Sequence, residues 1–379
     1  MIDHSVSPKR ILILASYAES LINFRGPLLK EMVSLGHYVM AGAPDLNESH
    51  HKNLKKMGVS VYETPLARTG LNPVKDLAYY RHLSSLIKKV SPDLVFTYTI
   101  KPNIWGAFAA RKHKVKSVSM MTGLGYAFTQ NNSKNFIQSL VRKIAIRLYR
   151  QATNRNHLVI FQNPDDRDDF IQEGCLADAS KVRMTNGSGV DTEFYSETPL
   201  PSKPVFLMIS RLLKNKGVRE YGEAAVRVKK LMPEAQFLLV GHKDEGPDSI
   251  SEDELNGWIY GGLEYLGPTT DVRPYLARCS IYVLPSYREG TPRSVLEALS
   301  IGRPVITSDA PGCRETVVNE DNGYLVPIAD VDVLSHKIIH LAKNEKLSQE
   351  MGAKSRALAL RKFDVNQVNK VLMQHLELI

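Results

Sequence analysis

The sequence predicts an α/β protein with two domains, each built on a parallel sheet. Short apolar runs alternate with longer amphipathic segments, which is the pattern of repeated strand–helix–strand units. The alternation stops at the Pro- and Ser-rich stretch YSETPLPSK and then starts again. A chain of 379 residues is also about two domains long. We therefore expect domains at residues 1–195 and 196–365, followed by a terminal helix at 366–379.

The expected elements of the first domain follow one another in regular alternation. Strand candidates are the short apolar runs at 11–16, 38–43, 59–63, 94–98, 117–121, 158–162 and 182–185. Helix candidates between them are 27–35, 76–90, 104–112 and 136–151. Because strands joined by helices run parallel, their carboxyl ends share one sheet edge, where ligands bind in such folds.

The second domain repeats this plan. Strands are expected at 204–210, 236–240, 281–284 and 305–308, and helices at 218–231 and 294–301. The terminal helix at 366–379 is placed after the last element of this domain.

The net charge of +9 is unevenly distributed. Residues 1–195 hold 26 Lys and Arg against 16 Asp and Glu, whereas the remainder holds 23 against 24. Residues 101–150 contain ten basic and no acidic residues. Such a surface suits nucleic acid, anionic lipid or an anionic substrate, and it is equally compatible with a solvated basic face.

The three cysteines are too few and too scattered for a disulfide framework or a structural zinc site, which indicates a cytoplasmic protein. The first ten residues are polar, so no signal peptide is expected, and no apolar run is long enough to span a bilayer. No Cys/His cluster is apparent, and we expect neither a metal nor a cofactor.

The stretch from Cys279 to Thr316 combines a strand, a Gly/Pro turn and a helix. A helix that starts after such a turn presents free N–H groups and a partial positive charge to a phosphate. Glu289 in the turn either complements the helix dipole or contacts a ligand. Glu297 lies within the apolar segment VLEALSI, where an unpaired carboxylate would be costly. There it could accept hydrogen bonds from vicinal hydroxyls such as those of a ribose.

The segment EGTPRSVLEAL, with its two glutamates eight positions apart, resembles retaining GT-B glycosyltransferases of family 4. The resemblance implies two Rossmann-like domains that face a central cleft, a nucleotide-sugar donor and no metal. It implies as well that the terminal helix at 366–379 crosses back to the first domain. It implies that Glu297 binds the donor ribose. It also implies that Glu289 and the backbone of Gly290, Thr291 and Pro292 contact the donor sugar and its β-phosphate.

Two cations follow the first strand of the second domain. Arg211 and Lys216 lie on one loop, and a guanidinium fork with an ammonium group suits a diphosphate. The alternative is a pair of solvated loop cations. The resemblance places both residues on the donor diphosphate, where they would stabilise the leaving nucleotide. His242, after the next strand, is a further candidate nucleotide contact.

The first domain supplies a weaker set of candidates. The loop with Arg25 and Gly26 lacks a G-x-G-x-x-G dinucleotide motif. The resemblance places this loop, Lys101, Gly123 and Gly125 near the acceptor or the diphosphate, although an ordinary turn explains the glycines equally well. Many family members carry a histidine close to the second glycine-containing loop, and this chain has none there.

Leu71-Asn72-Pro73 and Gly123-Leu124-Gly125 are similar to loops in family members that act on polyprenyl-diphosphate sugars. This narrower resemblance implies a transferase that moves N-acetylgalactosamine, or a related hexose, from a UDP-sugar to an undecaprenyl-diphosphate-linked sugar in surface polysaccharide or glycan assembly. The predicted basic helix at 136–151 is either an ordinary surface helix or an interfacial one at the inner face of the cell membrane.

Two alternatives to this function remain open. A nucleotide-sugar 2-epimerase of the same fold would convert the donor without an acceptor. A non-enzymatic basic protein would bind lipid or nucleic acid through residues 101–150, but it would leave the two glutamates and the two loop cations unexplained. We therefore expect a peripheral membrane enzyme that does not bind nucleic acid.

Overall fold

The computed structural model describes residues 7–67, 72–124, 136–246 and 248–379. Its contacts divide the chain into two compact units. The first unit comprises Met1–Ser188 and Val368–Ile379, and the second comprises Gly189–Gln367.

The division falls before Gly189, whereas the sequence analysis placed it after residue 195. Residues 189–195 belong to the second unit because their backbone is bonded there. The Val190 amide donates to the Phe363 carbonyl at 2.7 Å, and the Val365 amide donates to the Val190 carbonyl at 2.9 Å. A polar composition marks the link between the units but does not reveal these bonds.

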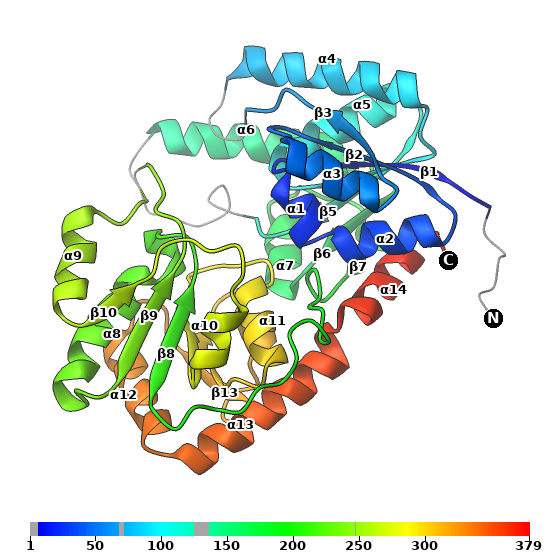
Figure 1. The fold of residues 1–379 in the computed structure, drawn as a ribbon. Coiled ribbons are helices and arrows are strands. Elements are labelled where there is room, and N and C mark those ends of the chain that lie inside the picture. The colour runs from blue at the N-terminus through cyan, green and yellow to red at the C-terminus, as the bar shows by residue number, and fades with distance from the viewer. Residues whose placement is uncertain (1–6, 68–71, 125–135, 247) are drawn as a thin grey trace. The chain divides into compact units, whose positions relative to one another are not determined.

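The first unit contains a parallel sheet with the strand order β3-β2-β1-β4-β5-β6-β7 (Figure 1). Its strands are β1 (Arg10–Leu14), β2 (Tyr38–Ala43), β3 (Ser60–Glu63), β4 (Leu94–Tyr98), β5 (Lys116–Met121), β6 (Leu158–Phe161) and β7 (Val182–Met184). The order reverses between β1 and β4, which creates a topological switch point at that place.

Helices cover both faces of this sheet. They are α1 (Glu19–Asn23), α2 (Gly26–Ser34), α3 (Glu48–Lys56), α4 (Pro73–Val90), α5 (Ala107–Lys112), α6 (Phe136–Thr153), α7 (Pro164–Gln172) and the end of α14 (Val365–His375). A π-helical turn (Pro102–Gly106) precedes α5, and a 3₁₀ turn (Ala179–Lys181) precedes β7.

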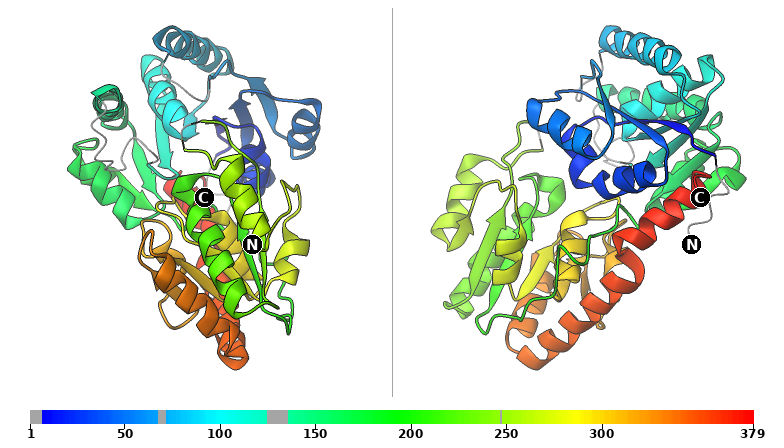
Figure 2. Two further views of the ribbon diagram at one scale, coloured as in Figure 1. Left: turned by 90° about the vertical axis from the view of Figure 1, so that its left-hand side faces the viewer. Right: turned by 45° about the vertical axis from the view of Figure 1, so that its right-hand side comes forward.

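The alternation of side chains along β1 shows how one strand serves two cores. Ile11 and Ile13 pack into the cluster that includes α2 and the end of α14, whereas Leu12 and Leu14 pack into the cluster that includes α4 and α5. Successive residues of a strand point to opposite faces, so a fully buried strand reads as one continuous apolar run. The red end of α14 lies beside the blue α2 (Figures 1 and 2).

The second unit contains a parallel sheet with the order β10-β9-β8-β11-β12-β13. Its strands are β8 (Val205–Ile209), β9 (Gln236–Val240), β10 (Leu263–Tyr265), β11 (Ile281–Leu284), β12 (Val305–Ser308) and β13 (Gly323–Val326). The order reverses between β8 and β11, so this sheet has its own switch point. The loops after these two strands are therefore the expected place for a ligand.

The helices of the second unit also pack on both faces of its sheet. They are α8 (Val218–Leu231), α9 (Glu252–Tyr260), α10 (Arg273–Arg278), α11 (Arg293–Ser300), α12 (Val331–Ala342), α13 (Glu345–Leu358) and the first turn of α14. Shorter turns are Lys214–Lys216, Arg314–Thr316 and the π-helical Ala359–Phe363. Among the helices that the structure describes, none has the length and apolarity to cross a membrane.

Candidate functional site

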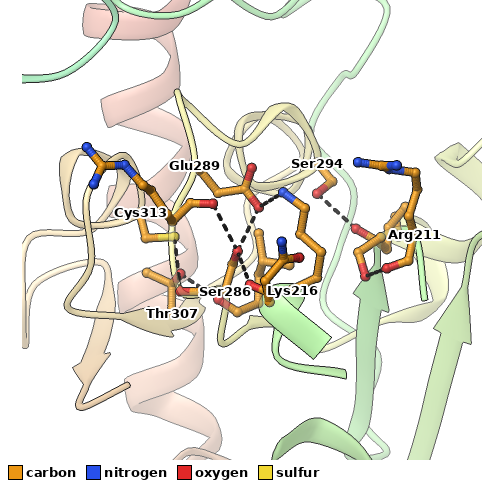
Figure 3. A network of polar contacts seen from close by, with 12 residues as sticks. Arg211, Lys216, Ser286, Glu289, Ser294, Thr307 and Cys313 are labelled. Carbon is orange, nitrogen blue, oxygen red and sulfur yellow. Dashed lines mark hydrogen bonds and ion pairs between the residues drawn. The ribbon is translucent and has the colours of Figure 1, made fainter. Parts of the chain in front are cut away.

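The candidate site lies at the carboxyl edge of the second sheet. The loops that follow β8, β11 and β12 meet there, and Figure 3 shows the polar contacts among them. The predicted residues Arg211, Lys216 and Glu289 come from the first two of these loops. This is the switch point of the sheet, and ligands of such sheets bind beyond the carboxyl ends of the strands at that point.

Lys216 and Glu289 form the centre of the site. The Lys216 Nζ atom lies 2.6 Å from Oε1 of Glu289, and both side chains are largely buried. The Ser286 hydroxyl donates a hydrogen bond to the same carboxylate oxygen at 2.8 Å. A lysine ammonium and a carboxylate separated by 73 positions in sequence therefore face each other at the end of β8 and β11.

Gly217 allows the loop of Lys216 to approach the loop of Glu289. It has φ +75°, and a Cβ atom at this position would lie 2.0 Å from the Pro285 carbonyl oxygen. Only glycine fits so close to another backbone at such an angle. The two loops are also joined by the Tyr287 amide, which donates to the Asn215 carbonyl at 2.9 Å.

The loop after β12 supports the Glu289 loop from the other side. The Glu289 amide donates to the Pro311 carbonyl at 2.9 Å, and the Cys313 thiol contacts the Ser286 carbonyl at 3.7 Å. Thr307, on β12, donates to the Leu284 carbonyl at 2.6 Å. Burial raises the pKa of the Cys313 thiol, so this group packs as a neutral side chain.

Arg211 lies to the right of the Lys216–Glu289 pair in Figure 3 and forms its ion pair with a different acid. Its Nη1 atom lies 2.7 Å from Asp244, and the Arg211 side chain is 53% exposed. The structure thus brings Lys216 and Glu289 together but engages the second predicted phosphate ligand elsewhere. Asp244 was not identified from the sequence, because nothing in its local pattern indicates this partner.

Glu297 is buried within α11, as the apolar segment around it predicted. Its Oε1 atom accepts a hydrogen bond from Arg293 Nε at 3.0 Å. Burial raises the pKa of the Glu297 carboxyl, and the charge of Arg293 opposes that rise. The nearby Tyr195 hydroxyl also contributes to lowering the pKa of this carboxyl. Sequence analysis overlooked Arg293, although its spacing of four residues from Glu297 on a helix indicates the contact.

The other residues predicted to bind the nucleotide-sugar lie in two loops of this unit. Gly290, Thr291 and Pro292 form the turn into α11, with Pro292 at the N-cap position. The side chain of His242 is exposed, and its carbonyl accepts a hydrogen bond from the Leu212 amide at 2.9 Å. Whether these residues contact a nucleotide-sugar stays a prediction.

Two predicted residues of the first unit, Arg25 and Lys101, are buried. Arg25 stacks over the Tyr98 ring, 5.1 Å from its centroid, and contacts the Met120 sulfur at 2.8 Å. Lys101 lies 2.9 Å from Asp76 and donates to the Ala67 carbonyl at 2.8 Å.

A contact of this arginine or this lysine with the acceptor or the diphosphate stays a prediction. Both cations are used inside the unit, since a buried charge needs a partner. The neighbouring Gly26 is the first residue of α2 and is buried.

The glycine loop after β5 is only partly described. Gly123 has φ +109° and is half-buried. Gly125 lies outside the described residues, as do residues 68–71, which include Leu71 of the predicted turn. Asn72, which follows that turn, caps α4 by accepting hydrogen bonds from the Val74 and Lys75 amides at 3.0 and 3.2 Å.

Metal ligands do not gather in the part of the chain that the structure describes: no group of three or more His, Cys, Asp or Glu side chains is suitably placed. His336 and His340 have a four-residue spacing on α12, and Asp330 and Asp332 a two-residue spacing. These pairs do not form a larger cluster, because Asp330 caps α12 and Asp332 pairs with Arg227.

Comparison with known families divides the chain as the sheets do. Residues 191–358 match the family described as glycosyl transferases group 1. Residues 25–187 match a glycosyl transferase 4-like domain.

The relatives that match over most of the chain include two bacterial glycosyltransferases. A Campylobacter jejuni N,N'-diacetylbacillosaminyl-diphospho-undecaprenol alpha-1,3-N-acetylgalactosaminyltransferase is 30% identical, over 94% of this chain and 95% of its own length. An Escherichia coli UDP-Gal:alpha-D-GlcNAc-diphosphoundecaprenol alpha-1,3-galactosyltransferase is 28% identical, over 85% of this chain and 84% of its own length.

Among solved structures, Anabaena HepE in complex with UDP and glucose superposes with a TM-score of 0.77. That likeness covers 97% of this chain and 99% of the other at 19% identity, so it concerns the fold alone. It confirms the GT-B architecture expected from the sequence.

Proposed function

Because this chain belongs to the group 1 glycosyltransferases, we propose that it is a retaining enzyme with a UDP-sugar donor and an undecaprenyl-diphosphate-linked sugar as acceptor. The proposed transferred group is N-acetylgalactosamine, or failing that a related hexose or N-acetylhexosamine. The support is the 30% identity to a transferase of that name over nearly the whole of both chains. The product would be an intermediate of a surface polysaccharide or glycan.

The single observation that carries a catalytic role is the Lys216–Glu289 pair at the switch point of the second sheet. In the proposed reaction an acceptor hydroxyl forms a bond to the anomeric carbon while the bond to the diphosphate breaks. The hydroxyl proton passes to the departing diphosphate. The acceptor attacks from the face that the nucleotide leaves, so the anomeric configuration is retained.

Each site residue has a distinct task in this proposal. Lys216 and Arg211 stabilise the negative charge that develops on the diphosphate, a type of contact worth about 2.7–4 kcal/mol in a transition state. Glu289 orients Lys216 and contacts the donor sugar, and Glu297 accepts hydrogen bonds from the ribose. Since two protein cations would neutralise the diphosphate, we propose that the reaction needs no metal, and EDTA should leave the rate unchanged.

We also place the enzyme peripherally on the inner face of the cell membrane, through α6. Leu140 and Ile144 are 48% and 43% exposed on this helix, beside the exposed Lys143 and Arg147. Apolar and basic side chains on one helical surface suit an anionic bilayer, with each basic residue contributing on the order of 1 kcal/mol. Sedimentation with phosphatidylglycerol vesicles, compared with phosphatidylcholine vesicles, tests this part. The double variant Lys143→Glu/Arg147→Glu should lose the preference, and an unchanged preference would refute it.

A donor panel tests the proposed activity. The purified chain, with bacterial membranes as the source of acceptor, is given UDP-, GDP- and dTDP-sugars, and lipid-extractable label is counted. Transfer from UDP-N-acetylgalactosamine with an α-linked product is expected. Lys216→Ala should lower kcat about 10²- to 10³-fold, and Glu297→Ala should raise the donor KM.

Three results would contradict parts of this assignment. Isomerised donor without any lipid product would indicate an epimerase. Transfer from a GDP- or dTDP-sugar would overturn the donor class. An inverted linkage would exclude the retaining mechanism.

A further inference from the structure

We propose that Arg293 is a positioning residue for the donor nucleotide, which holds the Glu297 carboxylate oriented and ionised from an anchor on the Gly189 carbonyl. This inference rests on the proposed function, in which Glu297 binds the ribose. It concerns a residue that makes the ribose site competent without touching the nucleotide itself.

The geometry fixes the Arg293 guanidinium at two points. Its Nε atom donates to Glu297 Oε1 at 3.0 Å, and its Nη1 atom donates to the Gly189 carbonyl at 2.8 Å. The two side chains are only 17% and 11% exposed. A planar guanidinium held by two partners from different segments has a defined orientation, in contrast to the half-exposed Arg211.

The electrostatic surroundings give Arg293 a second task. The groups that face Glu297 come from four segments: Arg293 on its own helix, Tyr195 before β8, Asp271 before α10, and Tyr282 on β11. Of these four, only Arg293 carries a positive charge, and Asp271 is an acid. Without Arg293, burial and Asp271 both favour the protonated carboxyl.

Protonation of Glu297 would weaken its contact with a ribose. An ionised carboxylate offers acceptors to two vicinal hydroxyls, whereas a protonated one has lost part of that capacity. Removal of Arg293 should therefore reduce nucleotide affinity most where Glu297 is protonated. The affinity should recover as the pH rises and the carboxyl ionises.

The experiment is isothermal titration calorimetry of UDP with the full chain, across about two units on either side of neutral pH. Arg293→Gln should bind UDP roughly ten- to a hundredfold more weakly at the acidic end, with partial recovery at the basic end. Arg293→Lys, which keeps the charge but not the fork, should lie between the variant and the wild type. Arg227→Gln, which removes an exposed ion pair with Asp332 in the same unit, is the matched control.

A second ligand separates positioning from a general structural effect. The compound 2′,3′-dideoxyuridine diphosphate lacks the hydroxyls that Glu297 would bind. Wild type and Arg293→Gln should bind it equally, because the ribose contact is absent in both cases. An equal loss for both ligands would indicate a damaged fold and would overturn the proposal.

Glu297→Ala distinguishes failure of this inference from failure of the proposed ribose site. If Glu297→Ala binds UDP as tightly as the wild type, the ribose role is wrong, and the inference falls with it. If Glu297→Ala binds weakly but Arg293→Gln and Arg293→Lys both bind like the wild type at every pH, the inference alone is wrong. A loss in Arg293→Gln that does not depend on pH would exclude control of ionisation.

Discussion

The substitution Gly217→Ala tests whether the close approach of two loops makes the site. The new Cβ atom would lie 2.0 Å from the Pro285 carbonyl oxygen, whereas ordinary contact begins at 3.4 Å. One loop must therefore move by about 1.4 Å, the difference between these distances. The left-handed conformation adds about 1–2 kcal/mol for a residue with a side chain.

This movement acts directly on Lys216, the preceding residue. Because a displacement of about 1 Å of a positioned group costs on the order of 10²-fold in rate, kcat/KM should fall by roughly that factor. The melting temperature should fall by about 2–8 °C, since 1 kcal/mol corresponds to about 2–4 °C for a domain of this size. Steady-state transfer and thermal unfolding measure the two effects.

Gly36→Ala is the matched control. Gly36 has φ +87°, and a Cβ atom there would meet nothing within 4 Å. Gly36→Ala should lower the melting temperature, because alanine is strained in the left-handed conformation, but it should transfer sugar at the wild-type rate. If Gly217→Ala also kept the wild-type rate, the loop contact would not position Lys216, and the reasoning would be refuted.

Other features of the structure lead to three further predictions. Asp76→Ala should lower the free energy of unfolding by about 3–5 kcal/mol in urea titrations, because it leaves the buried Lys101 ammonium without its carboxylate partner. The double variant Asp76→Ala/Lys101→Met should lose less stability than Asp76→Ala alone. An equal loss in the two variants would exclude the pairing. Hydrogen bonds from His157 and Lys116 lower the pKa of Glu377 from its ordinary value of 4.5 to about 2. The ionised Glu377 therefore stabilises the fold fully at pH values above 4.5, and this stabilisation is lost as the pH falls toward 2. Unfolding of Glu377→Gln should show a smaller acid dependence over this range, and an identical dependence would contradict the assignment. Burial raises the pKa of all three cysteine thiols, so iodoacetamide near neutral pH should label the unfolded chain but not the native one.

The sequence predicted the fold because buried parallel strands carry a strong signal. The expected strands at 281–284 and 305–308 coincide with β11 and β12, whose residues are all buried. The edge strands β3 and β7 of the first sheet were also expected, at 59–63 and 182–185, whereas the edge strands β10 and β13 of the second sheet were not assigned. Helices α12 and α13 were likewise not assigned. The expected helix at 104–112 begins earlier, with a π-helical turn across Pro102 that helical periodicity does not reveal.

The site was predictable as a set of residues but not as a set of contacts. Glu289, Glu297 and Lys216 stand out by composition and motif, yet their partners depend on which loops the fold brings together. The count of charges in residues 101–150 predicted that Lys101 belongs to a basic surface. In the structure Lys101 is buried and forms an ion pair with Asp76. A single sequence gives the number of charges but not which of them face one another.

Carboxylates pair with both cations of the site, and the exposure of each pair indicates which carboxylate a diphosphate can displace. The Arg211–Asp244 side chains are 53% and 28% exposed, whereas those of Lys216–Glu289 are 21% and 16% exposed. An exposed pair is worth about 0–1 kcal/mol, so a doubly charged phosphate group competes with Asp244 at little cost. Lys216 is held more firmly, because Ser286 and the close backbone contact at Gly217 fix the pair from both sides. We therefore expect Arg211 to change partner on donor binding, while Lys216 stays where the folded loops place it.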